Sequence, residues 1–256
     1  MCLVAFAHDV GPYELVLAAN RDERYDRPTA PADAWPDAPS VLGGRDLEKG
    51  GTWLAIATSG RLAAVTNVRR GAPVAGPRSR GELCAAFVRG ADEAPAFAER
   101  AFAERASYGS FNLVVRAGGR MAYASSVASV GVADVARGVY GLSNASMDVA
   151  WPKVVLAKRV LAEALELPTD AMTEELFAML ADRSLPDDER LPSTGVPRDV
   201  ERALAPVFVV TPAYGTRSST VVVWRRGGDV AFEERRFGAG GRLEGVTRRT
   251  TRVDAR

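Results

Sequence analysis

Cysteine and histidine are scarce in this chain of 256 residues, which has cysteines only at positions 2 and 84 and a single histidine, His8. Two isolated cysteines without CxxC spacing exclude a disulfide framework and, with one histidine, an ordinary Cys/His zinc site, so we expect no metal. A Ser-His-Asp or Cys-His triad would have to use His8 as its base, because no other imidazole exists. Nucleophilic chemistry must therefore use this histidine or a base of another kind.

Net charge and long hydrophobic runs are also lacking. The 33 basic and 32 acidic residues leave a formal charge of +1, so the chain has no overall field that would attract nucleic acid or anionic membranes. No apolar run approaches the roughly 20 residues needed to span a bilayer. The first residues, MCLVAFAHD, lack the basic stretch of a secretory signal. We expect a cytoplasmic protein with no nucleic-acid partner and no integral membrane association.

Short apolar runs separated by turn residues predict antiparallel hairpins. The first hairpin turns at Gly11-Pro12, and the other two turn at glycine-containing dipeptides. These predicted hairpins cover residues 2–19, 52–67 and 112–126. The proline-rich segment 27–40 is expected to be a surface loop, and to form a wall of a site rather than a domain boundary.

Four segments have apolar residues at helical spacing, with Ser79 and Thr173 as candidate N-caps. The predicted helices cover residues 80–90, 95–106, 151–167 and 173–183. Strand patterns return at 207–213, 220–226 and 229–237, and we expect the Arg- and Thr-rich tail to be frayed after about residue 240. Strands, then helices, then strands predict an α+β sandwich of antiparallel sheets covered by helices, in one domain over residues 1–256.

Cys2 is the most informative residue, because removal of Met1 would leave a thiol and a free α-amine on one Cα. The α-amine has a reference pKa of about 7.7 to 8.0, so it can act as a base near neutral pH without any histidine. The alternative is that Cys2 is only a small apolar residue at the start of a strand, since cysteine is often buried.

The predicted hairpin brings charged residues close to Cys2. A turn centred near residue 10 or 11 pairs residue i with about 21 − i, which puts Cys2 beside residue 19 and near Asn20, Arg21 and Asp22. Arg21 would favour the thiolate, Asp22 could orient the α-amine, and Asn20 could contact a substrate. The alternative is a solvated charged turn at the end of a strand.

Together with Cys2, the run Asn20-Arg21-Asp22-Glu23 resembles the NRDE family, whose eukaryotic members are the transport and Golgi organization 2 homologues. The resemblance extends from residue 1 to about 225 and includes several dispersed motifs in the right order. These motifs are Gly43-Gly44-Arg45-Asp46, Gly50-Gly51-Thr52-Trp53, Thr66-Asn67-Val68-Arg69, Gly141-Leu142-Ser143-Asn144, Trp151-Pro152-Lys153 and Gly215-Thr216-Arg217-Ser218-Ser219-Thr220.

The family is in turn similar to N-terminal nucleophile hydrolases of the penicillin V acylase and bile salt hydrolase type, which implies a four-layer αββα fold. That similarity implies Cys2 as the nucleophile, Arg21 as the thiolate partner and Asp22 as the residue that orients the amine. It also implies that Asn67 and Asn144 donate to an oxyanion and that Arg217 supports the cluster.

The residues themselves allow these roles. Asn67 and Asn144 each end a predicted strand, where an amide can donate into a cleft or simply bond its own turn. Trp53, Tyr140 and Trp151 could line an apolar substrate pocket, or pack in the core. Arg217 could equally be a surface arginine.

Three functions remain open. The first is an amide hydrolase that acts on a small or lipid-like substrate through an acyl-enzyme on Cys2. The second follows from the resemblance, since family members have been connected with haem trafficking and with lipid or acyl-CoA homeostasis: a carrier without turnover, in which haem would be cargo and not a cofactor. His8 lies at the predicted turn, away from Cys2, so we expect any haem binding to be weak and not centred on His8. The third is an interaction module.

Overall fold

The computed structural model describes residues 2–71 and 76–253, which form two antiparallel β-sheets. The first sheet has the strand order β10-β1-β2-β11-β12-β13, and the second runs from β3 to β9 in chain order. The strands of the first sheet are β1 (Cys2–Val10), β2 (Tyr13–Arg24), β10 (Gly138–Leu142), β11 (Tyr214–Arg225), β12 (Asp229–Phe237) and β13 (Leu243–Arg252). Those of the second are β3 (Thr29–Trp35), β4 (Ala38–Asp46), β5 (Leu54–Ala57), β6 (Leu62–Asn67), β7 (Phe111–Ala117), β8 (Arg120–Ser125) and β9 (Val132–Asp134).

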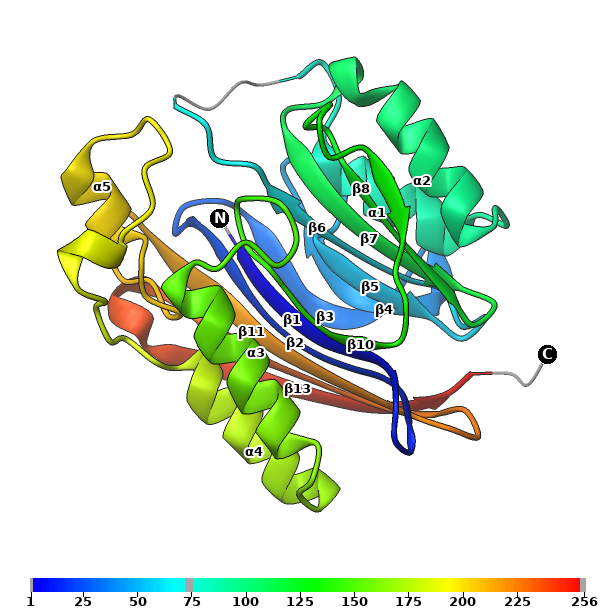
Figure 1. The fold of residues 1–256 in the computed structure, drawn as a ribbon. Helices are drawn as coiled ribbons and strands as arrows, with labels where there is room; N and C mark the ends of the chain where they lie inside the picture. The colour runs from blue at the N-terminus through cyan, green and yellow to red at the C-terminus, as the bar shows by residue number, and fades with distance from the viewer. Residues whose placement is uncertain (1, 72–75, 254–256) are drawn as a thin grey trace.

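Helices cover the outer faces of both sheets (Figure 1). Two of them, α1 (Arg80–Arg89) and α2 (Ala94–Ala103), pack on the second sheet. Two others, α3 (Pro152–Ala164) and α4 (Thr169–Leu180), pack on the first sheet. The short helix α5 (Arg198–Ala203) lies in the segment that leads from α4 to β11. The layers therefore follow the order α, β, β, α.

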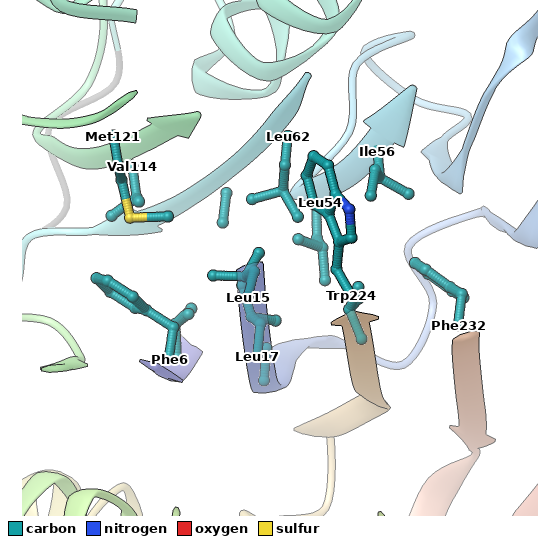
Figure 2. Close-up of a cluster of buried hydrophobic side chains, with 14 of the residues drawn as sticks. Phe6, Leu15, Leu17, Leu54, Ile56, Leu62, Val114, Met121, Trp224 and Phe232 are labelled. Atoms are coloured by element: carbon teal, nitrogen blue, oxygen red, sulfur yellow. The ribbon is translucent and has the colours of Figure 1, made fainter. Parts of the chain in front are cut away.

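Alternating side chains explain why both faces of the first sheet are covered. In β1, Val4 and Phe6 enter the core between the two sheets, whereas Leu3 and Ala5 enter the core beneath α3 and α4. Figure 2 shows the inter-sheet core, in which Phe6 of β1 lies on one side and Ile56 and Leu62 of the second sheet lie on the other. Side chains of a strand alternate between its two faces, so a strand apolar at every position needs a layer on each side. The predicted α+β, four-layer αββα architecture is confirmed.

The three predicted hairpins are present, but the register of the first differs from the prediction. Cys2 pairs with Arg21, not with residue 19, because the turn is centred between Gly11 and Pro12 and both strands are longer than expected. The run Asn20 to Glu23 consequently lies inside β2 instead of in a solvated turn. The shift of two residues keeps Arg21 on the same face of the hairpin as Cys2.

Two segments that the sequence predicted as irregular are edge strands. Residues 27–40 contain β3 and the start of β4 rather than a surface loop, and Pro31 is tolerated within β3 because this strand has a neighbour on one side only. Residues 243–252 of the tail are not frayed, since β13 pairs with β12 from Leu243 to Arg252, and the prediction for residues 254–256 lies outside the described residues. Its many arginines and threonines suit an exposed edge strand, where charge discourages further pairing.

Other differences concern element boundaries. Segment 207–213 is buried only over its first three residues and is not a strand, and β11 begins only at Tyr214. Thr173 does not cap a helix, because α4 already begins at Thr169 and the Thr173 hydroxyl donates to the Thr169 carbonyl at 2.8 Å. Ser79 does cap α1, as predicted. None of the helices in the described part of the chain is long and apolar enough to cross a membrane.

Candidate active site

Cys2 and Arg21 are direct cross-strand neighbours at the open end of the β1–β2 hairpin. The Arg21 side chain is 6% exposed, and its guanidinium lies 4.2 Å from the centre of the Trp53 ring. It donates to the Thr29 hydroxyl at 3.2 Å, while its nearest carboxylate, on Glu23, is 3.9 Å away. Arg21 is thus held by stacking and one hydrogen bond, without a close carboxylate.

Burial dominates the electrostatics of the Cys2 thiol. It raises the pKa of that thiol, and the smaller opposing effects include the charge of Arg21. The expected stabilisation of the thiolate by Arg21 is present but does not outweigh desolvation. The second cysteine, Cys84, is fully buried on α1, and burial raises the pKa of its thiol far above the usual range.

Asp22 lies next to this pair and is held from the opposite strand β11. The Thr216 hydroxyl donates to Asp22 Oδ1 at 2.7 Å, and the Tyr214 hydroxyl donates to the Asp22 carbonyl at 2.8 Å. Burial raises the pKa of the Asp22 carboxyl, whereas Lys153 and Arg21 lower it. A buried carboxylate is costly unless a positive charge lies beside it, so these two residues favour the ionised form of Asp22.

Lys153, which the sequence singled out only as part of the Trp151-Pro152-Lys153 motif and without a role, is a further member of this cluster. Its side chain is only 4% exposed, and its ammonium donates to the carbonyls of Leu204 at 2.9 Å and Pro206 at 3.4 Å. Burial lowers the pKa of Lys153 to about 8, although the charge of Asp22 opposes the shift. The available signal was a rare lysine on the apolar face of α3, in a chain with only three lysines.

A cleft of about 350 Å³ joins several of the predicted residues. Its lining includes Cys2, Arg21, Asp22, Trp53 and Asn67. These residues come from four separate segments, so the cleft exists only because the second sheet lies over the end of the β1–β2 hairpin.

Asn144 lines a separate cavity and is not part of the lining of this cleft. It is fully buried, and its side-chain amide donates to the backbone carbonyl of Asn67 at 2.8 Å. Its own backbone carbonyl accepts from the Arg69 amide at 2.8 Å. This contact fixes the end of β6, and with it the position of Asn67.

Arg217 also forms hydrogen bonds with backbone carbonyls. Its guanidinium donates to the carbonyls of Arg24 at 2.8 Å, Tyr25 at 2.9 Å and Phe237 at 3.3 Å. These bonds hold the chain where it leaves β2, directly after the Asn20 to Glu23 run. This geometry is compatible with the predicted supporting role of Arg217, although Arg217 itself does not line the cleft.

The remaining predicted substrate contacts lie elsewhere. The Asn20 amide donates to the carbonyls of Leu180 at 2.8 Å and Val207 at 2.9 Å on the helical side of the sheet, because adjacent residues of β2 point to opposite faces. Tyr140 stacks on Phe6 with ring centres 5.3 Å apart. Trp151 lines a different cavity, with Asn144. Of the four proposed substrate contacts, the cleft contains Trp53 alone.

A larger cavity of about 540 Å³ adjoins the cleft. It shares Glu23, Asn67 and Arg80 with the cleft. Its apolar wall comes from the segments around β6 and α5, and charged side chains of the same segments also line the cavity. The apolar residues are Val68, Val196, Val200, Ala203 and Leu204, and the charged ones are Arg69, Arg70 and Asp199. An apolar part of a ligand fits this cavity while a reacting group lies beside Cys2.

His8 lies within β1, not at the turn itself, and is buried at the other end of the hairpin. Six residues separate it from Cys2 along one strand, which is about 20 Å. Burial, and then the charge of Arg116, lower the pKa of His8. Among residues 2–71 and 76–253, no three His, Cys, Asp or Glu side chains gather where they could hold a metal ion.

Comparison with known proteins gives consistent relatives. The family model described as Transport and Golgi organisation 2 matches residues 1–239. The Transport and Golgi organization protein 2 homologues of Bos taurus and Homo sapiens are 36% and 32% identical to this chain, and each match covers 92% of both proteins. The Drosophila melanogaster protein is 31% identical over 87% of both chains. A solved structure, the Caenorhabditis elegans N-acylethanolamine-hydrolyzing acid amidase (NAAA) ortholog, matches 87% of this chain and 92% of its own with 11% identity and a TM-score of 0.42.

Proposed function

The chain belongs to the Transport and Golgi organisation 2 family, and we propose that it is an N-terminal-cysteine amide hydrolase acting on a small or lipid-like substrate. The observation that carries the proposal is the pairing of Cys2 with Arg21 inside a cleft that also contains Asp22 and Asn67. A thiol, a positive charge, a carboxyl and an amide donor are the groups that acyl transfer requires.

In the proposed reaction the α-amine of Cys2, freed by removal of Met1, takes the proton of its own thiol. The sulfur then attacks the amide carbon, and the ammonium returns the proton to the leaving nitrogen as the C–N bond breaks. Water finally hydrolyses the thioester and releases the acid. Asp22 accepts a hydrogen bond from the α-amine and orients it, while the side-chain amide of Asn67 donates to the oxyanion.

Three further residues support these roles. Asn144 holds the backbone of Asn67, so it acts on the oxyanion through Asn67. Arg217 holds the chain beyond Glu23. Lys153 lowers the pKa of Asp22 and thereby favours the carboxylate that the α-amine needs.

The mature protein is expected to begin at Cys2, because the proposed base exists only when Met1 is absent. Intact mass spectrometry of protein purified from its own host measures this directly. Protein overexpressed elsewhere serves as the control for incomplete processing. Retention of Met1 in the native material would contradict the N-terminal-nucleophile mechanism.

The apolar cavity favours a second candidate, a carrier of a lipid, an acyl-CoA or haem without turnover. A volume of about 540 Å³ beside the cleft suits a ligand larger than a small amide. A turnover assay with acyl amides separates the two functions: a hydrolase cleaves an amide as the wild type and loses this turnover in Cys2→Ala, whereas a carrier binds its ligand and shows no turnover in either protein.

A further inference from the structure

Arg80 occupies a fixed position at the first residue of α1. The Ser79 side chain accepts from the Gly81 amide at 3.3 Å, and Glu82 accepts from the Ser79 amide at 2.9 Å, which defines where the helix begins. The first turn lies directly against the segment before β5, where a Cβ at Gly51 would come within 2.5 Å of the Gly81 carbonyl carbon. Two glycines therefore let α1 approach closely enough to bring Arg80 to the cleft.

The Arg80 side chain lies at the junction of the Cys2 cleft and the apolar cavity, since it lines both. It is half-buried, and within residues 2–71 and 76–253 it has no hydrogen bond and no ion pair. Burial lowers the pKa of Arg80, while the charges of Cys2 and Glu23 oppose this shift.

Other arginines of the cleft have partners. Arg27 bonds Asp46 at 2.7 Å. Arg78, only two residues before Arg80, bonds Glu82 and Glu104, each at 3.1 Å. Arg80 differs from both, because its guanidinium offers five donors to the cleft without an acceptor from the described residues.

A guanidinium that is partly removed from water without an acceptor is unfavourable, and a planar anion relieves this by accepting two parallel N–H bonds. The carboxylate that faces the same space, Glu23, is shared between Arg21 at 3.9 Å and Arg27 at 3.7 Å. A ligand anion can therefore approach Arg80 while the charge of Glu23 is offset by these two arginines.

We infer that Arg80 binds an anionic group of the ligand, a carboxylate or a phosphate, at the junction between the Cys2 cleft and the apolar cavity. The ligand is an amphiphile: its apolar chain occupies the cavity lined by Val200 and Leu204, and its anionic group contacts Arg80 near the reacting carbonyl. The inference rests on the proposed function for the location of the reacting carbonyl, but binding of the anion requires no turnover.

The test measures binding in a Cys2→Ala background, so that hydrolysis cannot consume the probe. Dodecanoate, dodecyl phosphate and uncharged dodecanamide are compared by calorimetry below their aggregation concentrations. At least one anionic probe is expected to bind about tenfold more tightly than the amide, and the better of the two distinguishes carboxylate from phosphate. Arg80→Gln should remove this preference, Arg80→Lys should retain part of it, and Arg78→Gln should leave it unchanged.

An unchanged preference in Arg80→Gln, equal affinity for the amide, or no binding of either anion would overturn the inference. Thermal unfolding of each variant establishes that loss of binding is not loss of fold. If native protein hydrolyses no amide but the anion preference depends on Arg80, the hydrolase proposal fails and this inference stands.

Discussion

Both ends of the β1–β2 hairpin bury an arginine against a tryptophan, but a carboxylate lies in close contact with the arginine at only one end. At the turn end, Arg116 is 2% exposed, lies 4.0 Å from the centre of the Trp224 ring and forms an ion pair with Glu14. At the open end, Arg21 stacks on Trp53 in the same manner, yet its nearest carboxylate is 3.9 Å away. Arg116 is thus paired with a contacting carboxylate, whereas Arg21 has only a more distant one, and under the proposed function the charge of Arg21 acts on the Cys2 thiol.

The titratable neighbours of the two arginines differ in the same way. His8, beside Arg116, has a buried Nδ1 without a hydrogen-bond partner among the described residues. The open end instead gathers Cys2, Asp22 and Lys153, whose charges affect one another's pKa. Perturbed and mutually coupled groups beside a cleft are typical of a functional site, and this supports the open end as the reactive one.

The largest expected difference between the two ends is in catalysis. Cys2→Ala should reduce any amide hydrolysis to background, because it removes the nucleophile, whereas His8→Ala should retain it. Turnover of a panel of acyl amides, with and without EDTA, measures both effects, and the chelator should have no effect.

A His8→Ala variant that is inactive although folded would move the chemistry to the turn end. Sensitivity to EDTA would mean that Asp22, Glu23 and Asp46 hold a metal ion, which the proposed mechanism does not use.

The second largest expected effect is on the free energy of unfolding, which should depend on pH in a different range at each end of the hairpin. The folded-state pKa of Lys153 is lowered to about 8, so the unfolded chain binds more protons between about pH 8 and 10.5. The free energy of unfolding should therefore contain a contribution that rises by roughly 3 kcal/mol across this window. Urea unfolding at several pH values should show this rise in the wild type relative to Lys153→Met.

The turn end provides the matched comparison. Burial lowers the pKa of His8 from its ordinary 6.5, so its contribution to stability is lost as the pH falls below that value. His8→Gln should weaken the fall in the free energy of unfolding below pH 6.5 and leave its rise between about pH 8 and 10.5 unchanged. A Lys153→Met variant with the alkaline slope of the wild type would show that Lys153 is not buried as a titrating ammonium.

The smallest effect concerns the reactivity of the cysteines. Iodoacetamide near pH 7.5 should label Cys2 well before Cys84, whose thiol is buried. Arg21→Ala should slow the labelling of Cys2 about three- to tenfold, because the thiolate loses a positive neighbour. Arg116→Ala is the matched control, since it removes the arginine of the other end. Peptide mass spectrometry over time gives both rates, and equal slowing by the two substitutions would indicate a general loss of stability.

The sequence predicted most of the local structure but less of how the strands lie side by side in the two sheets. The hairpins at 52–67 and 112–126 and helix α1 were predicted because alternation, glycine turns and capping residues act within a few residues. The edge strands β3 and β13 were missed, because prolines, arginines and threonines also occur in loops and only a neighbouring strand distinguishes the two.

In the candidate site, too, the sequence predicted contacts within one hairpin but not those between distant segments. Cys2 and Arg21 could be brought together from the sequence because one short hairpin joins them, and even a register error of two residues preserved their shared face. Asn20 was assigned to the wrong side of the sheet, since its partners Leu180 and Val207 belong to distant segments. The family resemblance, confirmed by the match over residues 1–239, correctly drew attention to the motifs without giving their contacts.

The sequence by itself determined the layered α+β architecture and limited the chemistry, because side-chain alternation is local and two cysteines with one histidine leave few nucleophiles and bases. Only the tertiary structure decided that Lys153 and Asp22 share one buried cluster and that Arg80 lies between two cavities with no hydrogen bond or ion pair to the described residues. The physical reason is that desolvation and charge pairing depend on which layers pack together, and no periodicity within a single segment encodes that packing.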